Sequence, residues 1–271
     1  MSRINWTSEK IFTRLLNNKT QKTFWDNITE LRKRPNKEVY NQAYNLSKSN
    51  NEKEKIIGIY VLAQLGFKPR YQQDKTVSLY FDLLKNEKSP KVISAILSSI
   101  SHNNENINDN HISKLVKYKK HSYSNVRFDL TLALSGLENN RAINTLIGLS
   151  NDKDSDIRNW ATFALGTQIE SDTEEIRTAL WNRVNDSDFQ TKSESIVGLA
   201  NRMDKRIKEV IISELKTGDF GTLLFDAILK LNDKDFLPLL TKNLNIVKND
   251  KDGINKGWIL ALEETIIKLR K

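Results

Sequence analysis

The sequence predicts an all-α fold, an α-solenoid or superhelix of about eight antiparallel helix pairs. An apolar anchor residue recurs along the chain at steps of 35, 34, 31, 34 and 32 residues. The anchors are Leu65, Ile100, Leu134, Leu165, Leu199 and Leu231. Each anchor ends a segment with the apolar spacing of an amphipathic helix, and a polar break and a second such segment follow. A period of about 30 to 45 residues with two helices per period is typical of an α-solenoid.

The composition agrees with a folded, soluble chain. Of 271 residues, 38% are hydrophobic and 28% are charged, which suits a continuous core and not a disordered chain. The absence of cysteine excludes disulfides and thiolate chemistry and favours a reducing compartment. No signal-like start and no stretch of about 20 apolar residues is present. We therefore expect a cytoplasmic protein without membrane contact.

The first 51 residues are expected to form a basic N-terminal helical cap or degenerate repeats. Thr7 and Ser8 can cap a helix over 8–17, and Thr20 begins a second helix that runs to Lys33. Pro35 stops that helix, because proline cannot continue it, and a helix over 37–48 follows.

The regular repeats are expected over 52–232, and 233–271 should form C-terminal helices and a cap of one continuous solenoid. In each repeat the residues 8, 4 and 1 positions before the anchor share its helix face, and those at 4 and 1 are often small, which allows close helix packing. These small residues are Ser99, Ala133, Ala161, Ala164, Ser195 and Gly198. Second helices are predicted over 73–85, 109–119, 140–150, 173–184, 204–216 and 235–247, and a last helix over about 254–270. The expected capping residues are Ser89 with Pro90, Ser124, Asp172 with Thr173, Asp204, Asp219 and Asp235.

Two segments, 124–136 and 152–166, resemble HEAT repeats, and more narrowly the short bacterial HEAT-like repeats that also occur in phycobilisome lyases. The shared pattern is an acidic turn, a β-branched residue, an arginine and then Ala and Ala-Leu-Gly. Arg127 and Arg158 match the arginine, Lys192 stands at its place in the next repeat, and Ile93 departs from it. The resemblance covers about 52–232. It implies a fold that mostly serves as a protein-binding scaffold, although some members are lyase subunits and one group excises alkylated bases from DNA.

The two matching arginines allow two interpretations. They could form a ladder in which each bonds a loop carbonyl or a carboxylate of an adjacent repeat, with Asp129, Asp156 and Asp188 as candidates. They could instead form a row of cations on one surface. We favour the ladder.

No catalytic, metal or cofactor site is predicted. Asp152, Asp154 and Asp156 imitate the start of a calcium loop, but Ile157 and Phe163 stand where an EF-hand needs Gly and Glu. Since Asp186 and Asp188 repeat the pattern 34 residues later, helix capping is the better explanation. The three histidines, His102, His111 and His121, lack metal-ligand spacing.

Positive charge and tryptophan supply the candidates for binding. Residues 1–80 hold 15 Lys and Arg against 7 Asp and Glu, whereas 81–271 hold 28 against 27. This asymmetry indicates contact with an acidic partner, or reflects only solvated lysines. An exposed tryptophan would anchor a protein partner or stack on a base, although burial is the more common outcome. The tryptophans are Trp160 and Trp181 in the repeats and Trp6, Trp25 and Trp258 in the terminal caps.

We therefore expect a non-catalytic protein-binding scaffold or adaptor that uses the concave surface of a HEAT-like solenoid, with a protein partner that could be acidic. A toxin-neutralising and an assembly role are both compatible, and the oligomeric state stays open. The binding candidates are Trp160, Arg158, Arg127, Lys192, Trp181, Lys33, Arg34 and Lys37. The alternative is a nucleic-acid-binding HEAT-like protein, including a DNA glycosylase for alkylated bases. Trp160, Asp156 and Arg158 supply residue types that such chemistry needs.

Overall fold

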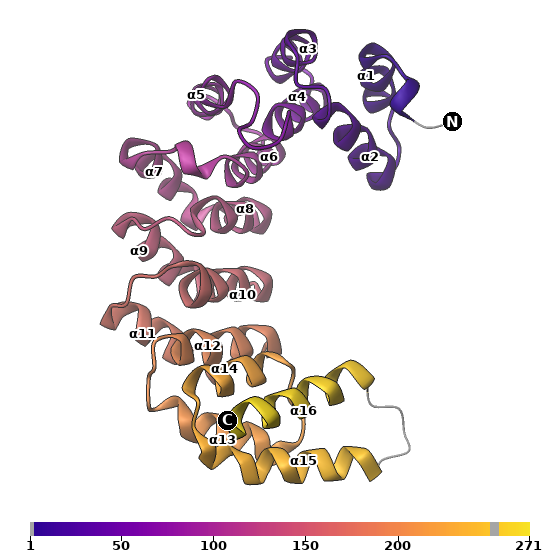
Figure 1. The fold of residues 1–271 in the computed structure, drawn as a ribbon. Coiled ribbons are helices and arrows are strands. Elements are labelled where there is room, and N and C mark those ends of the chain that lie inside the picture. Colours follow the sequence, from indigo (N-terminus) through magenta and orange to yellow (C-terminus); the bar gives the residue numbers. More distant parts are fainter. Residues whose placement is uncertain (1–2, 250–254) are drawn as a thin grey trace. The chain divides into compact units, whose positions relative to one another are not determined.

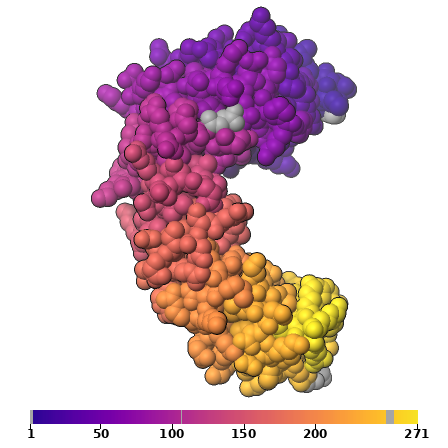
Figure 2. Space-filling model, turned by 60° about the vertical axis from the view of Figure 1, so that its left-hand side comes forward, coloured from indigo at the N-terminus to yellow at the C-terminus, as the bar shows by residue number. Residues whose placement is uncertain are grey.

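The computed structural model describes residues 3–249 and 255–271, and these form helices joined by short loops (Figure 1). Two compact units divide the chain: unit 1 covers Met1–Ala142 and unit 2 covers Ile143–Lys271. The predicted boundaries at 51 and 232 do not coincide with this division, and the continuity of the solenoid stays a prediction. Figure 2 shows the surface of both units, coloured by residue number from indigo at the N-terminus to yellow at the C-terminus.

The described residues contain sixteen α-helices, and the boundary between the units falls within α9. The helices of unit 1, with the one that crosses its end, are α1 (Ser8–Leu16), α2 (Gln21–Arg32), α3 (Lys37–Ser47), α4 (Glu52–Gln64), α5 (Gln73–Leu83), α6 (Pro90–Ser101), α7 (Asp109–Leu115), α8 (Ser124–Leu134) and α9 (Asn140–Leu149). Those of unit 2 are α10 (Ser155–Phe163), α11 (Glu174–Trp181), α12 (Phe189–Asn201), α13 (Ile207–Thr217), α14 (Leu223–Leu231), α15 (Leu237–Asn249) and α16 (Lys256–Arg270). A π-helical turn, Ala164–Gln168, extends α10. The predicted all-α class and the predicted helices are thus confirmed to within a few residues at each end.

Within unit 1 the helices α2, α4, α6 and α8 pack one on the next, and we call them the stacked row. The partner helices lie against one side of this row, with α1 on α2, α3 on α4, and α5 on α4 and α6 (Figure 1). We call the opposite side of the stacked row its open face. Unit 2 repeats the scheme, because α10, α12, α14 and α16 pack in sequence and α11 and α13 pack on α12.

Most of the anchors are fully buried, as predicted. Leu65, Ile100, Leu134, Leu165 and Leu199 are all 0% exposed. Leu231 is an exception, since it is half-buried while Ile228, one turn earlier, is 0% exposed. The reason is local: Asn232 takes the left-handed conformation with φ 49° and ends α14 at Leu231, so the core contact moves back by one turn.

Capping residues explain where several helices begin. Thr7, Thr20, Ser89 and Thr173 accept hydrogen bonds from free backbone N–H groups of the following turn, as predicted. Pro90 begins α6, as predicted, and Asp172 lies one residue before the cap Thr173. The four remaining predicted caps were wrong in position. Ser124 is already the first residue of α8, Asp204 and Asp219 precede their helices by several residues, and Asp235 lies inside a short 3-10 turn that Asp233 caps. None of the helices in the described ranges is long and apolar enough to cross a membrane.

Candidate functional site

The two repeat arginines stabilise the loops that precede their own helices. Arg127 is 5% exposed, and its Nη1 donates to the carbonyl oxygens of His121 at 2.8 Å and Ser122 at 3.3 Å. Arg158 makes the same contacts 31 residues later, with the carbonyl oxygens of Asp152 at 3.0 Å and Lys153 at 3.2 Å. Both arginines thus bond loop carbonyl groups, but those of the loop before their own helix and not, as the predicted ladder required, those of an adjacent repeat.

The carboxylate partners of the ladder differ from those predicted. Arg158 forms a bidentate pair with Asp186, with N–O distances of 3.0 and 2.9 Å, and these hydrogen bonds raise the pKa of the guanidinium. Asp129, Asp156 and Asp188 do not take this role. Asp188 caps α12, and Asp186 reaches Arg158 because the matching loops of consecutive repeats lie side by side.

Lys192 extends the series only in sequence. Its ammonium bonds Glu214 at 2.6 Å and lies 5.8 Å from the centre of the Phe189 ring. Its partner Glu214 belongs to α13, so Lys192 does not repeat the loop contacts of the two arginines.

The acidic turns act as helix caps, as predicted. Asp152 accepts from the backbone N–H of Asp154, and Asp154 accepts from that of Asp156 and caps α10. Asp186 likewise accepts from the backbone N–H of Asp188.

The three basic candidates near the N-terminus do not form one patch of equivalent cations. Arg34 is largely committed to the fold, since its guanidinium donates to the carbonyl oxygens of Trp6, Arg3 and Ile4 and pairs with Glu30. Lys33 lies 3.3 Å from the same glutamate with its side chain 54% exposed, and Lys37 is exposed at the start of α3.

The repeat tryptophans differ in exposure. Trp160 on α10 remains 39% exposed and packs edge-to-face on Phe163 with ring centres 5.7 Å apart. Trp181 on α11 is half-buried under Arg206, whose guanidinium lies 4.9 Å from the ring centre. Burial, the more common outcome, therefore does not hold for Trp160.

The residues proposed for a glycosylase do not converge. On α10 Asp156 and Trp160 are one turn apart and share a face, whereas Arg158 points about 160° away from each of them. Arg158 is turned toward the preceding loop and Asp186, whereas Trp160 lies beside Phe163. These three groups cannot act on one substrate atom from these positions.

An aromatic cluster lies on the surface of α2 and α4 in unit 1. Trp25 is 40% exposed, and its ring lies 5.1 Å from Phe24 and 5.1 Å from Tyr60, both in edge-to-face geometry. Phe24 and Tyr60 are half-buried and complete the triangle at 6.0 Å. Tyr60 belongs to the open face, because Gly58, two residues earlier on α4, faces α3 with its missing Cβ position 2.4 Å from the Ala43 carbonyl oxygen.

A carboxylate without a counterion continues this surface onto α8. Asp129 accepts a hydrogen bond from the Ser94 hydroxyl of α6. The Ser98 hydroxyl, one turn further along α6, interacts with both Asp129 and Tyr60. The cluster and the carboxylate are therefore joined across four helices, and we call the set Phe24, Trp25, Tyr60, Ser94, Ser98 and Asp129 the open-face site.

Burial decides the ionisation of both titratable groups at this site. It raises the pKa of Asp129 to about 6, although the two serine hydroxyls favour the charged form. It raises the pKa of Tyr60 to about 12, and the nearby Asp129 charge adds to that rise. At neutral pH the site thus presents a neutral phenol and a largely ionised carboxylate, which suits the binding of a cation.

The sequence contains a signal for this site that the anchor pattern did not use. The residue five positions before the anchor is Tyr60, Asp129, Trp160 and Glu194 in four of the repeats. Each of these side chains is half-buried or exposed on a helix of the packed rows. Burial raises the pKa of Glu194 as well. An aromatic or acidic residue five positions before the anchor therefore identifies the open side of the repeats.

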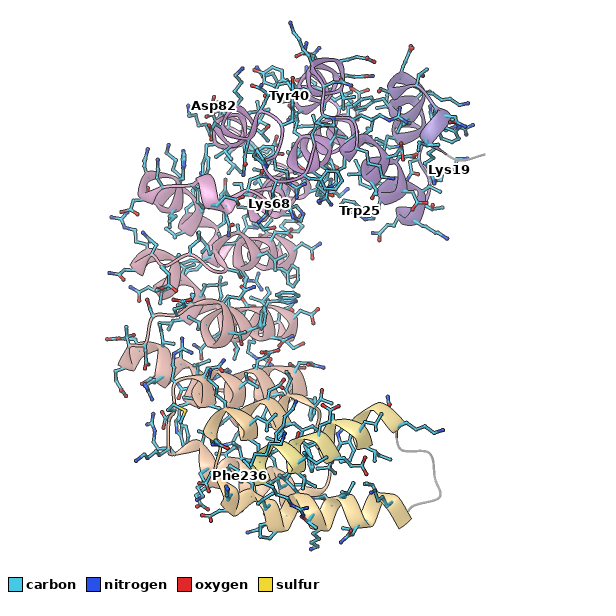
Figure 3. The ribbon with its side chains drawn as sticks, in the orientation of Figure 1. Lys19, Trp25, Tyr40, Lys68, Asp82 and Phe236 are labelled. Atoms are coloured by element: carbon cyan, nitrogen blue, oxygen red, sulfur yellow. The ribbon has the colours of Figure 1, made fainter. Side chains whose placement is uncertain are left out.

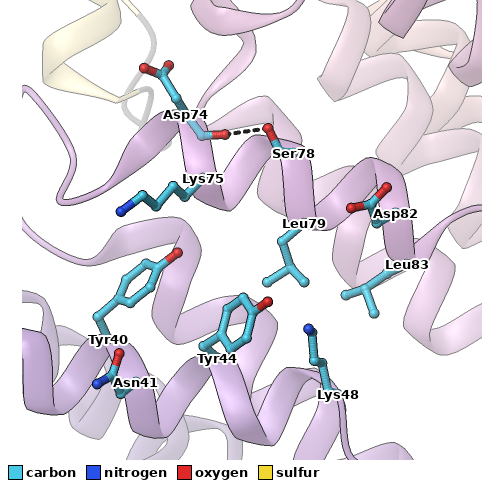
Figure 4. Close-up of a pocket in the computed structure, with 10 residues that line it drawn as sticks. All are labelled: Tyr40, Asn41, Tyr44, Lys48, Asp74, Lys75, Ser78, Leu79, Asp82 and Leu83. Atoms are coloured by element: carbon cyan, nitrogen blue, oxygen red, sulfur yellow. Dashed lines mark hydrogen bonds between the residues drawn. The ribbon is translucent and has the colours of Figure 1, made fainter.

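The opposite side of unit 1 holds a cavity of about 660 Å³ between α3 and α5 (Figure 4). Trp25 and Tyr40 mark the two sides in Figure 3. Tyr40 and Tyr44 stack at 6.1 Å, Lys48 lies 4.3 Å from the Tyr44 ring centre, and the Ser78 hydroxyl bonds the Asp74 carbonyl oxygen. Because these side chains contact one another within the cavity wall, we assign them a role in the packing of the fold and no binding function.

Comparison with known proteins agrees with the repeat fold. No protein-family profile matches the chain. The chain is 28% identical to protein YibA of Escherichia coli K12 over 188 residues, which cover 68% of this chain and 66% of YibA, slightly less than two thirds of its length. YibA of Escherichia coli O157:H7 gives the same values.

Solved structures show the same class. The crystal structure of Escherichia coli YibA matches with a TM-score of 0.73 at 24% identity, covering 99% of this chain and 94% of YibA. An engineered protein matches with a TM-score of 0.52 at 15% identity, covering 95% and 77%. The chain is therefore similar to YibA and has an all-α repeat-solenoid fold, whereas the narrower likeness to lyase-type repeats stays a prediction.

Proposed function

We propose that this chain is a non-catalytic protein-binding scaffold and that the open face of the stacked row in unit 1 binds the partner. The observation that carries the proposal is the exposed Phe24–Trp25–Tyr60 cluster. Tryptophan and tyrosine are the residues most often found at the energetic centre of protein interfaces.

The packing of the cluster supports a role as an anchor. Trp25 leaves 40% of its surface exposed, although its ring is held between two others. A ring that is already fixed loses little side-chain entropy when a partner covers it. Aromatic pairs of this kind contribute roughly 0.5–1.5 kcal/mol beyond area burial, which favours this ring arrangement before binding.

The proposal is tested by affinity capture from a native cell extract treated with nuclease and washed at moderate salt. The bait is the full chain, compared with Trp25→Ala and with Tyr123→Ala, which removes an aromatic side chain that is 60% exposed at the start of α8. We expect one stoichiometric protein to be captured by the parent chain and by Tyr123→Ala, and to be lost with Trp25→Ala. Purified components should then form a complex weakened at least tenfold by Trp25→Ala, as for an interface hot spot. Equal capture by all three chains would overturn the assignment of the surface.

The alternative, nucleic-acid binding with or without glycosylase activity, rests on the net charge of +9. It has less support, because the guanidinium groups of Arg34, Arg127 and Arg158 donate hydrogen bonds to acceptors of the chain itself. Titration with DNA and RNA at several salt concentrations distinguishes the two. Tight binding that falls steeply with rising salt, through counterion release, would favour the alternative.

A further inference from the structure

We propose that the open-face site is a receptor for one cationic side chain, arginine or lysine, of the bound protein, with Asp129 as the charge partner and the Phe24–Trp25–Tyr60 cluster as the stacking surface. This inference rests on the proposed function and names the chemistry of the partner at that surface.

The carboxylate of Asp129 has no counterion within the described part of unit 1. Among the described residues of unit 1, no Lys or Arg pairs with Asp129, and its hydrogen-bond partners are the neutral hydroxyls of Ser94 and Ser98. A partly desolvated charge without a counterion is unfavourable, and its pKa rises for that reason. An asparagine at position 129 would accept the same hydrogen bond from Ser94 without placing a partly desolvated charge there. The carboxylate is therefore better explained by a positively charged ligand.

Tyr60 faces both parts of the site, since its ring packs on Trp25 at 5.1 Å and its hydroxyl interacts with Ser98, which also reaches Asp129. A cation placed over the ring faces would gain cation–π attraction within about 6 Å while it approaches the carboxylate. A guanidinium suits this arrangement best, because it stacks flat on aromatic rings and bonds a carboxylate with two N–H groups.

The charge of the surrounding chain limits which proteins can supply this side chain. Residues 1–80 hold 15 basic against 7 acidic residues, so a strongly cationic protein would be repelled at long range. The site therefore selects a single arginine or lysine on a surface that is otherwise neutral or acidic. This reconciles the predicted acidic partner with an acidic receptor site.

The experiment uses the full chain and two defined probes, the peptides acetyl-Gly-Gly-Arg-Gly-Gly-amide and its citrulline analogue. Citrulline has nearly the same shape as arginine but no charge. Binding is followed by the NMR signals of the tryptophan indoles, with Trp25 assigned through Trp25→Phe. At pH 8 we expect the arginine peptide to shift the Trp25 signal saturably and the citrulline peptide to bind at least tenfold more weakly. A lysine peptide tests the ammonium.

Two further arms test the role of Asp129. Asp129→Asn should weaken binding at least tenfold at pH 8, whereas Asp82→Asn, which removes an exposed charge from the opposite side of unit 1, should leave it unchanged. With the parent chain, binding should fall as the pH drops through about 6, where Asp129 takes up a proton. Tyr60 faces this carboxylate from α4 and stays neutral, and Ser94 and Ser98 of α6 do not titrate in this range.

The outcomes separate this inference from the proposed function. Equal binding of the citrulline peptide, or unchanged binding by Asp129→Asn, would overturn the cation receptor. Capture of a protein that depends on Trp25 would survive either result. Conversely, a saturable arginine response without any captured protein would support the receptor while contradicting the scaffold surface. The pH arm needs no variant, so it remains decisive if Asp129→Asn fails to fold.

Discussion

The glycines Gly166 and Gly198 bring two neighbouring repeats into backbone contact, since a Cβ atom on Gly198 would lie 2.6 Å from the Cα atom of Gly166. Gly166 belongs to the π-helical turn after α10, and Gly198 lies in α12. The same added Cβ would lie 3.1 Å from both methyl groups of Leu180 on α11. Three helices therefore meet where there is no room for a side chain.

We predict that Gly198→Ala lowers the free energy of unfolding by about 1–3 kcal/mol, the usual cost of overpacking a core. The matched control is Gly148→Ala in α9, where a Cβ would meet nothing within 4 Å. It should raise stability by roughly 0.5–1 kcal/mol, because alanine suits a helix better than glycine. Denaturant unfolding monitored by circular dichroism measures both. A neutral Gly198→Ala would mean that α10 and α12 can separate without loss of packing.

The helix pairs could be predicted because the same apolar periodicity recurs in every repeat. The anchors Leu134, Leu165 and Leu199 each stand at the centre of a buried stripe, so a single misplaced residue hardly affects the pattern. The prediction that Leu231 is a fully buried anchor was wrong, because α14 ends before Asn232, which takes the left-handed conformation. This local backbone conformation leaves no periodic signal in the sequence.

The open-face site was harder to predict because it is built from single residues on four helices. Ser94 and Asp129 lie 35 residues apart, and their contact depends on how far α8 is shifted along α6. A one-dimensional pattern places both on exposed or half-buried positions but does not say that they touch. Arg158 shows the same limit, since its ladder role was predicted but its partner Asp186 was not.

Arg202 hydrogen-bonds backbone carbonyl groups near the ends of neighbouring helices. Its guanidinium is buried and donates to five carbonyl oxygens, those of Leu165, Gly166, Ile169, Ser171 and Gly198. We predict that Arg202→Met, which keeps the apolar stem, lowers stability by about 2–4 kcal/mol, because buried carbonyl groups lose their donors.

The control for that change is Arg206→Met, which removes a guanidinium whose side chain is 51% exposed and pairs with Asp204. Buried Asp204 keeps the guanidinium of Arg177 at 3.3 Å, so this variant should lose less stability than Arg202→Met. Differential scanning calorimetry compares the two melting temperatures. Equal losses would indicate that water replaces the Arg202 donors.

Tyr80 and Tyr40, two buried tyrosines of unit 1, differ in how their hydroxyls are satisfied. Tyr80 donates to the Ile59 carbonyl oxygen at 2.7 Å, whereas the buried hydroxyl of Tyr40 lies beside that of Thr76 without a hydrogen bond of good geometry. We predict that Tyr80→Phe costs about 1–2 kcal/mol and that Tyr40→Phe is neutral or slightly stabilising. Chemical denaturation of both variants measures the difference, and a large loss with Tyr40→Phe would show that its hydroxyl is hydrogen-bonded in solution.

The pH dependence of stability should reveal the cost of the unpaired carboxylate. The pKa of Asp129 is raised to about 6, so between pH 4 and 6 the folded chain holds a proton that the unfolded chain has lost. The contribution of this group to stability therefore falls as pH rises through that window. Asp129→Asn cannot titrate, and we expect it to be more stable than the parent chain by about 2 kcal/mol above pH 7 and no more stable near pH 4.

Asp186 should behave in the opposite way. Burial disfavours its charge, but hydrogen bonds from Arg158 and the Asp188 backbone, together with the charges of Arg158 and Arg183, hold its pKa below the usual value. Its stabilising contribution is present at neutral pH and is lost as pH falls through that lowered pKa. Asp186→Asn should therefore cost about 2–3 kcal/mol at pH 7, because two half-buried guanidinium groups lose their charged partner, and less in acid. If both variants changed stability with the same sign at pH 7, the carboxylate at Asp129 would be structural, and the case for a cationic ligand would lose its energetic basis.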